Sequence, residues 1–277
     1  MKNRIFILAI ALLLALCCAA YAGELAENET AAIDLDGDGV LETISWTYEE
    51  IDEYDAVVDL KIRSEGADDC VEYVSETLYQ AAVYVSDASD LPIIFITGDI
   101  MSDDYYTWAL TYADGAVTEL QFENILRGNL EGGFCDLGYG YLADISGNSI
   151  TLTGTQDFVG TYFCPRTFTL QDNAFVLSDD GVFHVEADID EYTWSDDNYA
   201  LMTTQLPVTA HYESGDAEMP AGTKLIVTGS DRTSFISFLT IDGEAGSFDL
   251  SFDDDEWTFF VGGISEYELF DRVPYCD

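Results

Sequence analysis

Short stretches in which polar and apolar residues alternate recur along this chain of 277 residues, separated by turn-forming pairs such as Asp114-Gly115 and Asp172-Asn173. No long segment repeats its apolar residues with the helical period of 3.6. Alternation places every second side chain on one face of a strand, which predicts an all-β fold. Residues 72–79 also permit a short helix. The clearest stretches are residues 43–48, 56–63, 80–85, 93–97, 105–112, 117–122, 138–145, 149–153, 161–170 and 175–177.

The composition allows a buried core although the chain is very acidic. Apolar residues make up 48% and aromatic residues 13%, which is enough for folded domains. Against this stand 54 acidic and nine basic residues, a formal net charge of −45. Such a field repels nucleic acid and anionic lipid and attracts cations, so nucleic acid is excluded as a partner. Cation binding and adaptation to high salt both explain the acidity.

Residues 1–22 have the pattern of a signal peptide. Lys2 and Arg4 precede an apolar run at residues 5–16, and the small residues of Ala20-Tyr21-Ala22 predict cleavage before Gly23. The run is too short to span about 30 Å of hydrocarbon, so no membrane span is expected. The mature protein is predicted to be secreted, with cell-surface association open, and loses two basic residues, which brings its net charge from −45 to −47.

Four cysteines follow the predicted cleavage site, and an even number in an exported chain indicates disulfides. Cys135 and Cys164 flank the hairpin-like passage 138–162, so their strands are expected to lie side by side. This predicts a Cys135–Cys164 bond and leaves Cys70 with Cys276. No Cys-x-x-Cys pair is present, so zinc is not expected.

The loop at residues 34–42 carries the strongest chemical pattern. Asp34, Asp36 and Asp38 alternate, Gly39 follows, and Glu42 closes the set. A tight loop can turn these oxygens toward one calcium ion, which takes six to eight oxygen ligands. Three carboxylates so close together also repel one another without a cation. An EF-hand would need its closing Glu at the position of Ser45, and the alternative without metal is an ordinary Asp-Gly surface turn.

A weaker echo of this loop occurs at residues 144–148, before the stretch 149–153. Leu152 stands where Glu42 closes the first loop, which favours a hairpin turn. The loop 34–42, the segment 91–114 with its Ser102-Asp103-Asp104-Tyr105 tract, and residues 144–168 together resemble degenerate FG-GAP-type calcium-loop propeller blades. The resemblance implies a partial or degenerate β-propeller-like domain over residues 23–192, since seven blades would need a longer chain. It implies calcium ligands at Asp34, Asp36, Asp38, the Val40 carbonyl and Glu42.

A smaller unit follows the acidic run 186–197. Five closely spaced stretches at residues 199–204, 206–211, 223–228, 234–241 and 244–252 predict a small β-barrel over residues 195–277, with Asp242-Gly243 as a two-residue hairpin turn. The tracts 219–225 and 242–246 resemble the bacterial Src-homology-three-like barrels. That resemblance implies binding of peptide or cell-wall polymer.

The sequence contains no nucleophile elbow, no His-Glu-x-x-His and no phosphate-binding loop. The two histidines, His184 and His211, are interpreted as structural, and pairs such as Asp253 with Glu256 arise by chance among so many acids. We therefore expect a non-catalytic, calcium-stabilised binding module for cell-wall polymer, glycan or peptide. A carbohydrate-active hydrolase using paired carboxylates and a purely structural surface protein are the alternatives. The aromatics Tyr105, Tyr106 and Trp108 are either a sugar-stacking rim or core.

Overall fold

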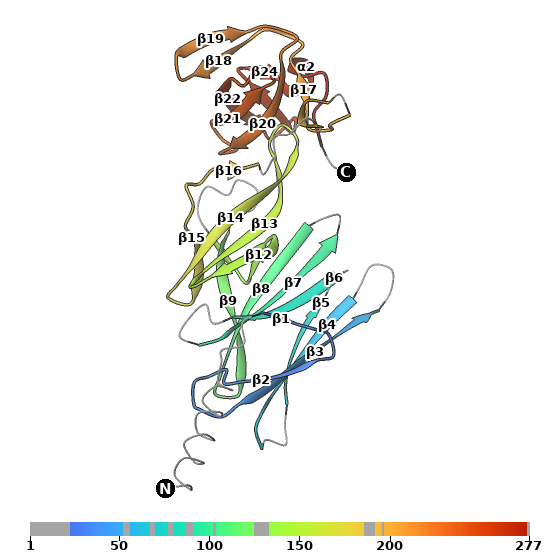
Figure 1. Cartoon of the computed structure of the whole chain (residues 1–277), viewed down its shortest axis with the longest axis vertical. Helices are drawn as coiled ribbons and strands as arrows, with labels where there is room; N and C mark the ends of the chain where they lie inside the picture. The colour runs from blue at the N-terminus through green and yellow to red at the C-terminus, as the bar shows by residue number, and fades with distance from the viewer. Residues whose placement is uncertain are drawn as a thin grey trace, which may run out of the picture. The chain divides into compact units, whose positions relative to one another are not determined.

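The computed structural model describes residues 23–51, 56–66, 70–76, 80–86, 91–101, 104–124, 133–185, 192–195 and 197–275, so the predicted signal peptide lies outside it. Within this part the chain is almost entirely strands and turns, which confirms the all-β class (Figure 1). Two compact units divide it. Of the described residues, unit one comprises those within 23–124, 133–152 and 168–176, and unit two comprises those within 153–167 and 177–275. No helix among the described residues has the length and apolar character needed to cross a membrane.

The first sheet of unit one has four described strands that pair antiparallel in chain order. Its side chains alternate as the sequence predicts, since Ile44 and Trp46 are buried and Tyr48 packs against the same core. Residues 71–76 form a strand, so the helical alternative is wrong for that part of the segment. The strands are β2 (Thr30–Ile33), β3 (Glu42–Glu50), β4 (Ala56–Ser64) and β5 (Val71–Glu76).

The second sheet curls into a half-barrel and has eleven strands among the described residues. Its order is β1-β6-β7-β8-β9-β15-β14-β13-β12, with β10 beside β9 and β11 beside β8. The part of β13 after Leu152 and the part of β14 before Phe168 belong to unit two. The strands are β1 (Gly23–Leu25), β6 (Gln80–Ser86), β7 (Ile93–Met101), β8 (Asp104–Ala113), β9 (Ala116–Asn124), β10 (Gly133–Cys135), β11 (Leu137–Tyr139), β12 (Tyr141–Ser146), β13 (Ser149–Asp157), β14 (Thr161–Gln171) and β15 (Ala174–Leu177).

The core of unit one uses both faces of the curled sheet. One face, with Ile94 and Ile96, packs against the apolar side of the four-stranded sheet. The other carries phenylalanines, and the rings of Phe122 and Phe175 stack with their centroids 5.0 Å apart. Gly138 lies against this second cluster, where a Cβ atom would come within 2.8 Å of Phe122. The combination is compatible with a propeller-like or a barrel fold.

Turns predicted from sequence occur where expected. Asp114-Gly115 joins β8 to β9 with φ angles of 52° and 75°, and Asp172-Asn173 joins β14 to β15 with 48° and 67°. These positive angles are the conformations that Asn, Asp and Gly adopt most readily. The echo at residues 144–148 ends in the Gly147-Asn148 turn between β12 and β13, as the hairpin interpretation predicts.

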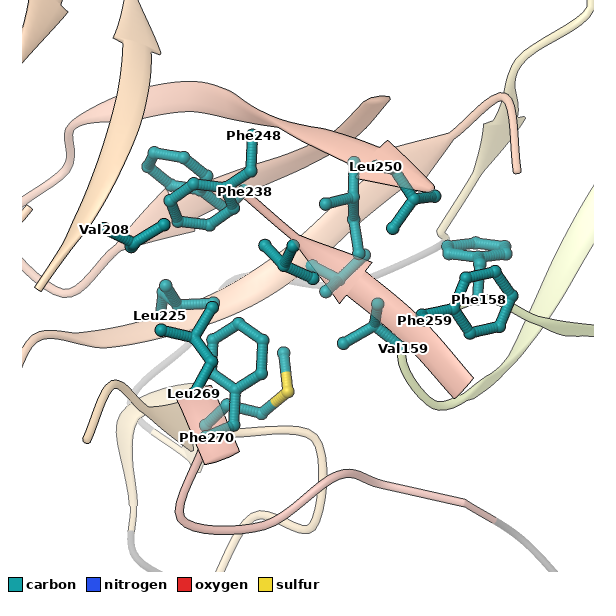
Figure 2. Close-up of a cluster of buried hydrophobic side chains, with 14 of the residues drawn as sticks. Phe158, Val159, Val208, Leu225, Phe238, Phe248, Leu250, Phe259, Leu269 and Phe270 are labelled. Atoms are coloured by element: carbon teal, nitrogen blue, oxygen red, sulfur yellow. The ribbon is translucent and has the colours of Figure 1, made fainter. Parts of the chain in front are cut away.

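Unit two contains a sheet of nine described strands around one core. The turn at residues 158–160 places Phe158 and Val159 in that core together with side chains of β20 to β23 (Figure 2). The loop between β21 and β22 covers four residues, 241–244, so the predicted two-residue turn is wrong. The elements are β16 (Phe183–His184), η2 (Tyr192–Trp194), β17 (Met202–Thr203), β18 (Val208–Tyr212), β19 (Gly215–Met219), β20 (Lys224–Ser230), β21 (Phe235–Thr240), β22 (Ala245–Asp253), β23 (Thr258–Val261), β24 (Ile264–Ser265) and α2 (Glu266–Leu269).

The predicted disulfide between Cys135 and Cys164 is wrong. Cys135 lies on β10 and its thiol donates to the Leu137 carbonyl at 2.6 Å, whereas Cys164 is buried in the core of unit two. The strands carrying them are not neighbours in the sheet, because β10 pairs with β9 and β14 lies between β13 and β15. Cys276 lies outside the described residues, and its predicted partner Cys70 has a free thiol, so the structure does not bear out that pairing either.

Candidate metal centre

The loop at residues 34–41 connects β2 to β3, at the edge of the four-stranded sheet (Figure 1). It is anchored to the core of unit one by Ile33 and Leu35, both buried. Gly37 and Gly39 have φ angles of 78° and 86°. A Cβ atom on Gly37 would also meet Leu91 at 2.9 Å. The backbone conformation therefore favours glycine at both positions, and at Gly37 a side chain would also displace the end of the Leu91 side chain.

Backbone N–H groups fold the loop around its own aspartates. The two oxygens of Asp34 accept hydrogen bonds from the N–H groups of Gly37 at 2.8 Å and Gly39 at 3.0 Å. Asp36 accepts one from Asp38 at 3.2 Å, and Asp38 accepts one from Val40 at 2.7 Å. Aspartate side chains that accept hydrogen bonds from nearby backbone N–H groups in this way stabilise a turn by themselves.

Glu42 closes the loop from its other end. It is the first residue of β3 and is paired with Ile33 of β2. Its side chain is 1% exposed, and Oε2 accepts the N–H of Leu35 at 2.9 Å. A buried carboxylate that receives a single hydrogen bond from the described residues is costly, so a further positive partner would stabilise it.

The fold brings together three of the predicted ligand side chains. One carboxylate oxygen each from Asp34, Asp36 and Glu42 lie within 4.8 Å of one another, and the first two residues are half-buried. Two oxygens bound to the same calcium ion at about 2.3–2.6 Å lie at most about 5 Å apart. The donor set therefore fits calcium in kind and spacing. The exposed Asp38 is not one of the three, and the roles of Asp38 and the Val40 carbonyl stay predictions.

Both histidines make contacts with aspartates. His184 Nε2 lies 2.9 Å from Asp180, and the ring of His211 lies between Asp216 at 2.8 Å and Asp249 at 3.2 Å. These hydrogen bonds raise the pKa of His211, with the bond to Asp216 the largest cause. The structural interpretation of the histidines fits these contacts.

The aromatics near Asp104 have packing partners. Tyr105 meets Tyr141 and Tyr106 meets Tyr139 edge to face, with ring centroids 5.3 and 5.4 Å apart. Trp108 packs against the core of unit one. The packing interpretation of these side chains therefore accounts for their contacts.

Sequence reasoning missed a buried carboxyl in unit two. Glu266, in the four-residue helix α2, is 0% exposed and accepts hydrogen bonds from the Tyr275 hydroxyl at 2.8 Å and the Phe259 N–H at 3.1 Å. Burial raises the pKa of Glu266. Neither the short helix nor the contact with Tyr275 has a signal in the sequence, since both depend on how the chain end packs.

No protein-family model, curated protein or solved structure matches this chain.

Proposed function

We propose that this chain is an exported, non-catalytic binding module whose first unit is stabilised by calcium held in the loop at residues 34–42. The observation that carries the proposal is the convergence of oxygens from Asp34, Asp36 and Glu42 within 4.8 Å. The hydrogen bonds to these carboxylates from described residues all come from backbone N–H groups, which are neutral. Their negative charges are thus left for an external cation.

The location of the loop explains what calcium would contribute. Glu42 begins β3, Asp34 follows β2, and Leu35 between them is fully buried. An ion bound to both ends of the loop would cancel the repulsion among the carboxylates and hold β2 and β3 in register. The ion would act as a structural staple, and the sheet surfaces would supply the binding function.

Two finer parts of the proposal concern family likeness. The four-stranded antiparallel order of β2 to β5, with an Asp-rich loop after its first strand, supports an FG-GAP-type calcium-loop blade. The short, closely paired strands β18 to β23 support a Src-homology-three-like barrel, and hence cell-wall polymer, glycan or peptide as the partner.

Thermal unfolding of the mature chain with calcium and with magnesium at equal ionic strength tests the ion. A ligand specific to the folded state adds about 2.7 kcal/mol at about 100 times its Kd. We expect this gain with calcium and little with magnesium, which demands octahedral geometry and keeps its water. Asp36→Asn should lose most of it. Asp172→Asn removes the same charge from an exposed turn of unit one and should keep it.

An equal response to both ions, or an unchanged calcium response in Asp36→Asn, would overturn the calcium site in favour of general charge screening. The binding function is tested separately by a screen of glycans, cell-wall polymers and peptides beside a hydrolysis screen on the same compounds. Release of product from a bound polymer would favour the hydrolase instead.

A further inference from the structure

A cavity of about 580 Å³ opens in unit two beside the turn between β22 and β23. This volume lies within the range of small-molecule sites, which is about 300–1,000 Å³. Its walls combine aromatic rings with carboxylates. The residues that matter are Phe252, Trp257, Tyr267, Tyr275, Asp157 and Asp254.

Two of the rings are unusually exposed for their size. Trp257 is 74% exposed and Tyr267 is 60% exposed. Trp257 meets Phe252 edge to face at 5.8 Å between centroids, and Tyr267 lies 6.4 Å from Tyr275. Large aromatic side chains left open to water around a cavity are typical of ligand-binding surfaces.

The chain holds the walls in place from behind. Asp253 Oδ1 accepts the N–H groups of Asp255 at 2.9 Å and Glu256 at 3.2 Å, which shapes the turn that presents Trp257. The Tyr275 hydroxyl donates to the buried Glu266 at 2.8 Å. Burial and the neighbouring Glu266 raise the pKa of Tyr275, so its ring stays a neutral phenol.

The charge of the cavity is not balanced. Asp157 and Asp254 are exposed carboxylates, while the one basic residue in the lining is Arg232. The Arg232 guanidinium donates to Gln156 at 3.0 Å and lies 5.8 Å from the centre of the Phe183 ring. Part of its hydrogen-bonding capacity is therefore committed to the protein, and the turn at residues 253–256 adds three further acids beside the cavity.

We propose that this cavity binds a small organic cation that carries a quaternary ammonium group. The negative faces of aromatic rings attract such a cation, and its diffuse charge gives up water more readily than a Lys ammonium does. A metal ion would bind to the carboxylates and leave the aromatic rings without a role. A neutral sugar would use the rings and leave the negative charge without a role. The inference rests on the proposed function in treating the chain as a binding module, but it uses unit two alone.

Calorimetric titration of the mature chain tests the proposal with choline and with its neutral isostere 3,3-dimethylbutan-1-ol, at fixed ionic strength. We expect choline to bind at least tenfold more tightly. Trp257→Ala should abolish choline binding, and Phe163→Ala, which removes a 43% exposed ring elsewhere in unit two, should leave it unchanged. Asp254→Asn should weaken binding several-fold, and Asp255→Asn should have a smaller effect because Asp255 lies beside the cavity but not in its lining.

Three results would overturn the inference: no measurable choline binding, equal binding of the neutral isostere, or choline binding that survives Trp257→Ala. Tighter binding of a neutral oligosaccharide than of choline would also overturn it and assign the cavity to a glycan. The calcium-loop variant Asp36→Asn separates this proposal from the calcium site. We expect it to lose the calcium response and bind choline with unchanged affinity.

Discussion

Two acidic sites, one in each unit, differ in how the charge of their carboxylates is balanced. In unit one, the carboxylates of Asp34, Asp36 and Glu42 converge and receive hydrogen bonds from backbone N–H groups. In unit two, Asp179 meets the guanidinium of Arg166 in a two-pronged pair at 2.6 and 2.9 Å. The charge of Asp179 is balanced by an arginine of the same chain. The charges of Asp34, Asp36 and Glu42 have no cationic partner among the described residues.

The Arg166 pair is well enclosed. Arg166 is 3% exposed, its guanidinium lies 4.2 Å from the centre of the Phe183 ring, and Asp179 also accepts the N–H groups of Thr167 and Gly181. Every strong hydrogen-bonding direction of Asp179 is thereby used. In unit two an arginine of the chain balances the acid, whereas in unit one we propose that an external cation does so. This difference predicts that calcium changes the stability of unit one and leaves that of unit two unchanged.

The largest effect is expected from breaking the internal pair. Asp179→Ala leaves the Arg166 charge buried without its carboxylate, which typically costs about 3–5 kcal/mol. The free energy of unfolding of unit two, measured by urea denaturation, should fall by that amount with or without calcium. Asp180→Ala is the matched control, because Asp180 pairs with His184 at the surface, and it should cost far less. Equal losses of stability in the two variants would show that the Arg166–Asp179 pair stabilises unit two no more than the surface pair of Asp180 and His184 does.

A comparable loss of stability is expected from removing the side chain of Phe158, in the turn between β13 and β14. Phe158 is 0% exposed, stacks on Tyr162 at 5.1 Å and lies 6.2 Å from Phe183. Phe158→Ala should cost about 3–5 kcal/mol. Phe163→Ala, on an exposed ring, should cost far less. The same two variants bear on the predicted domain boundary between residues 186 and 199, within which limited proteolysis should cut, because a barrel of residues 195–277 would lack Phe158.

An effect of opposite sign is expected in unit one. Glu42→Gln keeps an oxygen for the Leu35 N–H but removes one of three converging charges. Without calcium the variant should be as stable as the parent or slightly more so. With calcium it should lack most of the gain of about 2.7 kcal/mol expected at about 100 times the Kd. Melting temperatures without and with calcium measure the stability of the variant and its gain from the ion. A full calcium response in Glu42→Gln would exclude this residue as a ligand.

The smallest effect concerns pH in unit two. Burial raises the pKa of Glu266 above the ordinary value of 4.5, so the folded state holds its proton more tightly than the unfolded state does. The stability of unit two should therefore be greatest below pH 4.5 for this group and fall as the pH rises through the raised pKa. Glu266→Gln should remove that fall. Glu268→Gln, an exposed neighbour on α2, should keep it, and identical profiles for the parent and Glu266→Gln would contradict the prediction.

Local features of the molecule could be predicted from the sequence. The alternation in residues 43–48 and 56–63 marks β3 and β4 because a strand repeats its side-chain direction every two residues. Asp114-Gly115 marks a hairpin because few residue pairs accept two positive φ angles. The Asp34 to Asp38 loop is equally local, since its aspartates bind backbone N–H groups within five residues.

Features that depend on distant segments were decided by the tertiary structure. Packing buries Glu42 beside the loop, brings Phe158 into the core of unit two, and separates Cys135 from Cys164 by placing them on strands that do not pair. The aromatic cavity joins Asp157, Trp257 and Tyr275 across more than a hundred residues. Alternation specifies which side of a strand is apolar, but many pairings of strands satisfy that pattern equally well. The choice among them comes from close packing of whole side chains, whose shape complementarity is a property of the assembled core.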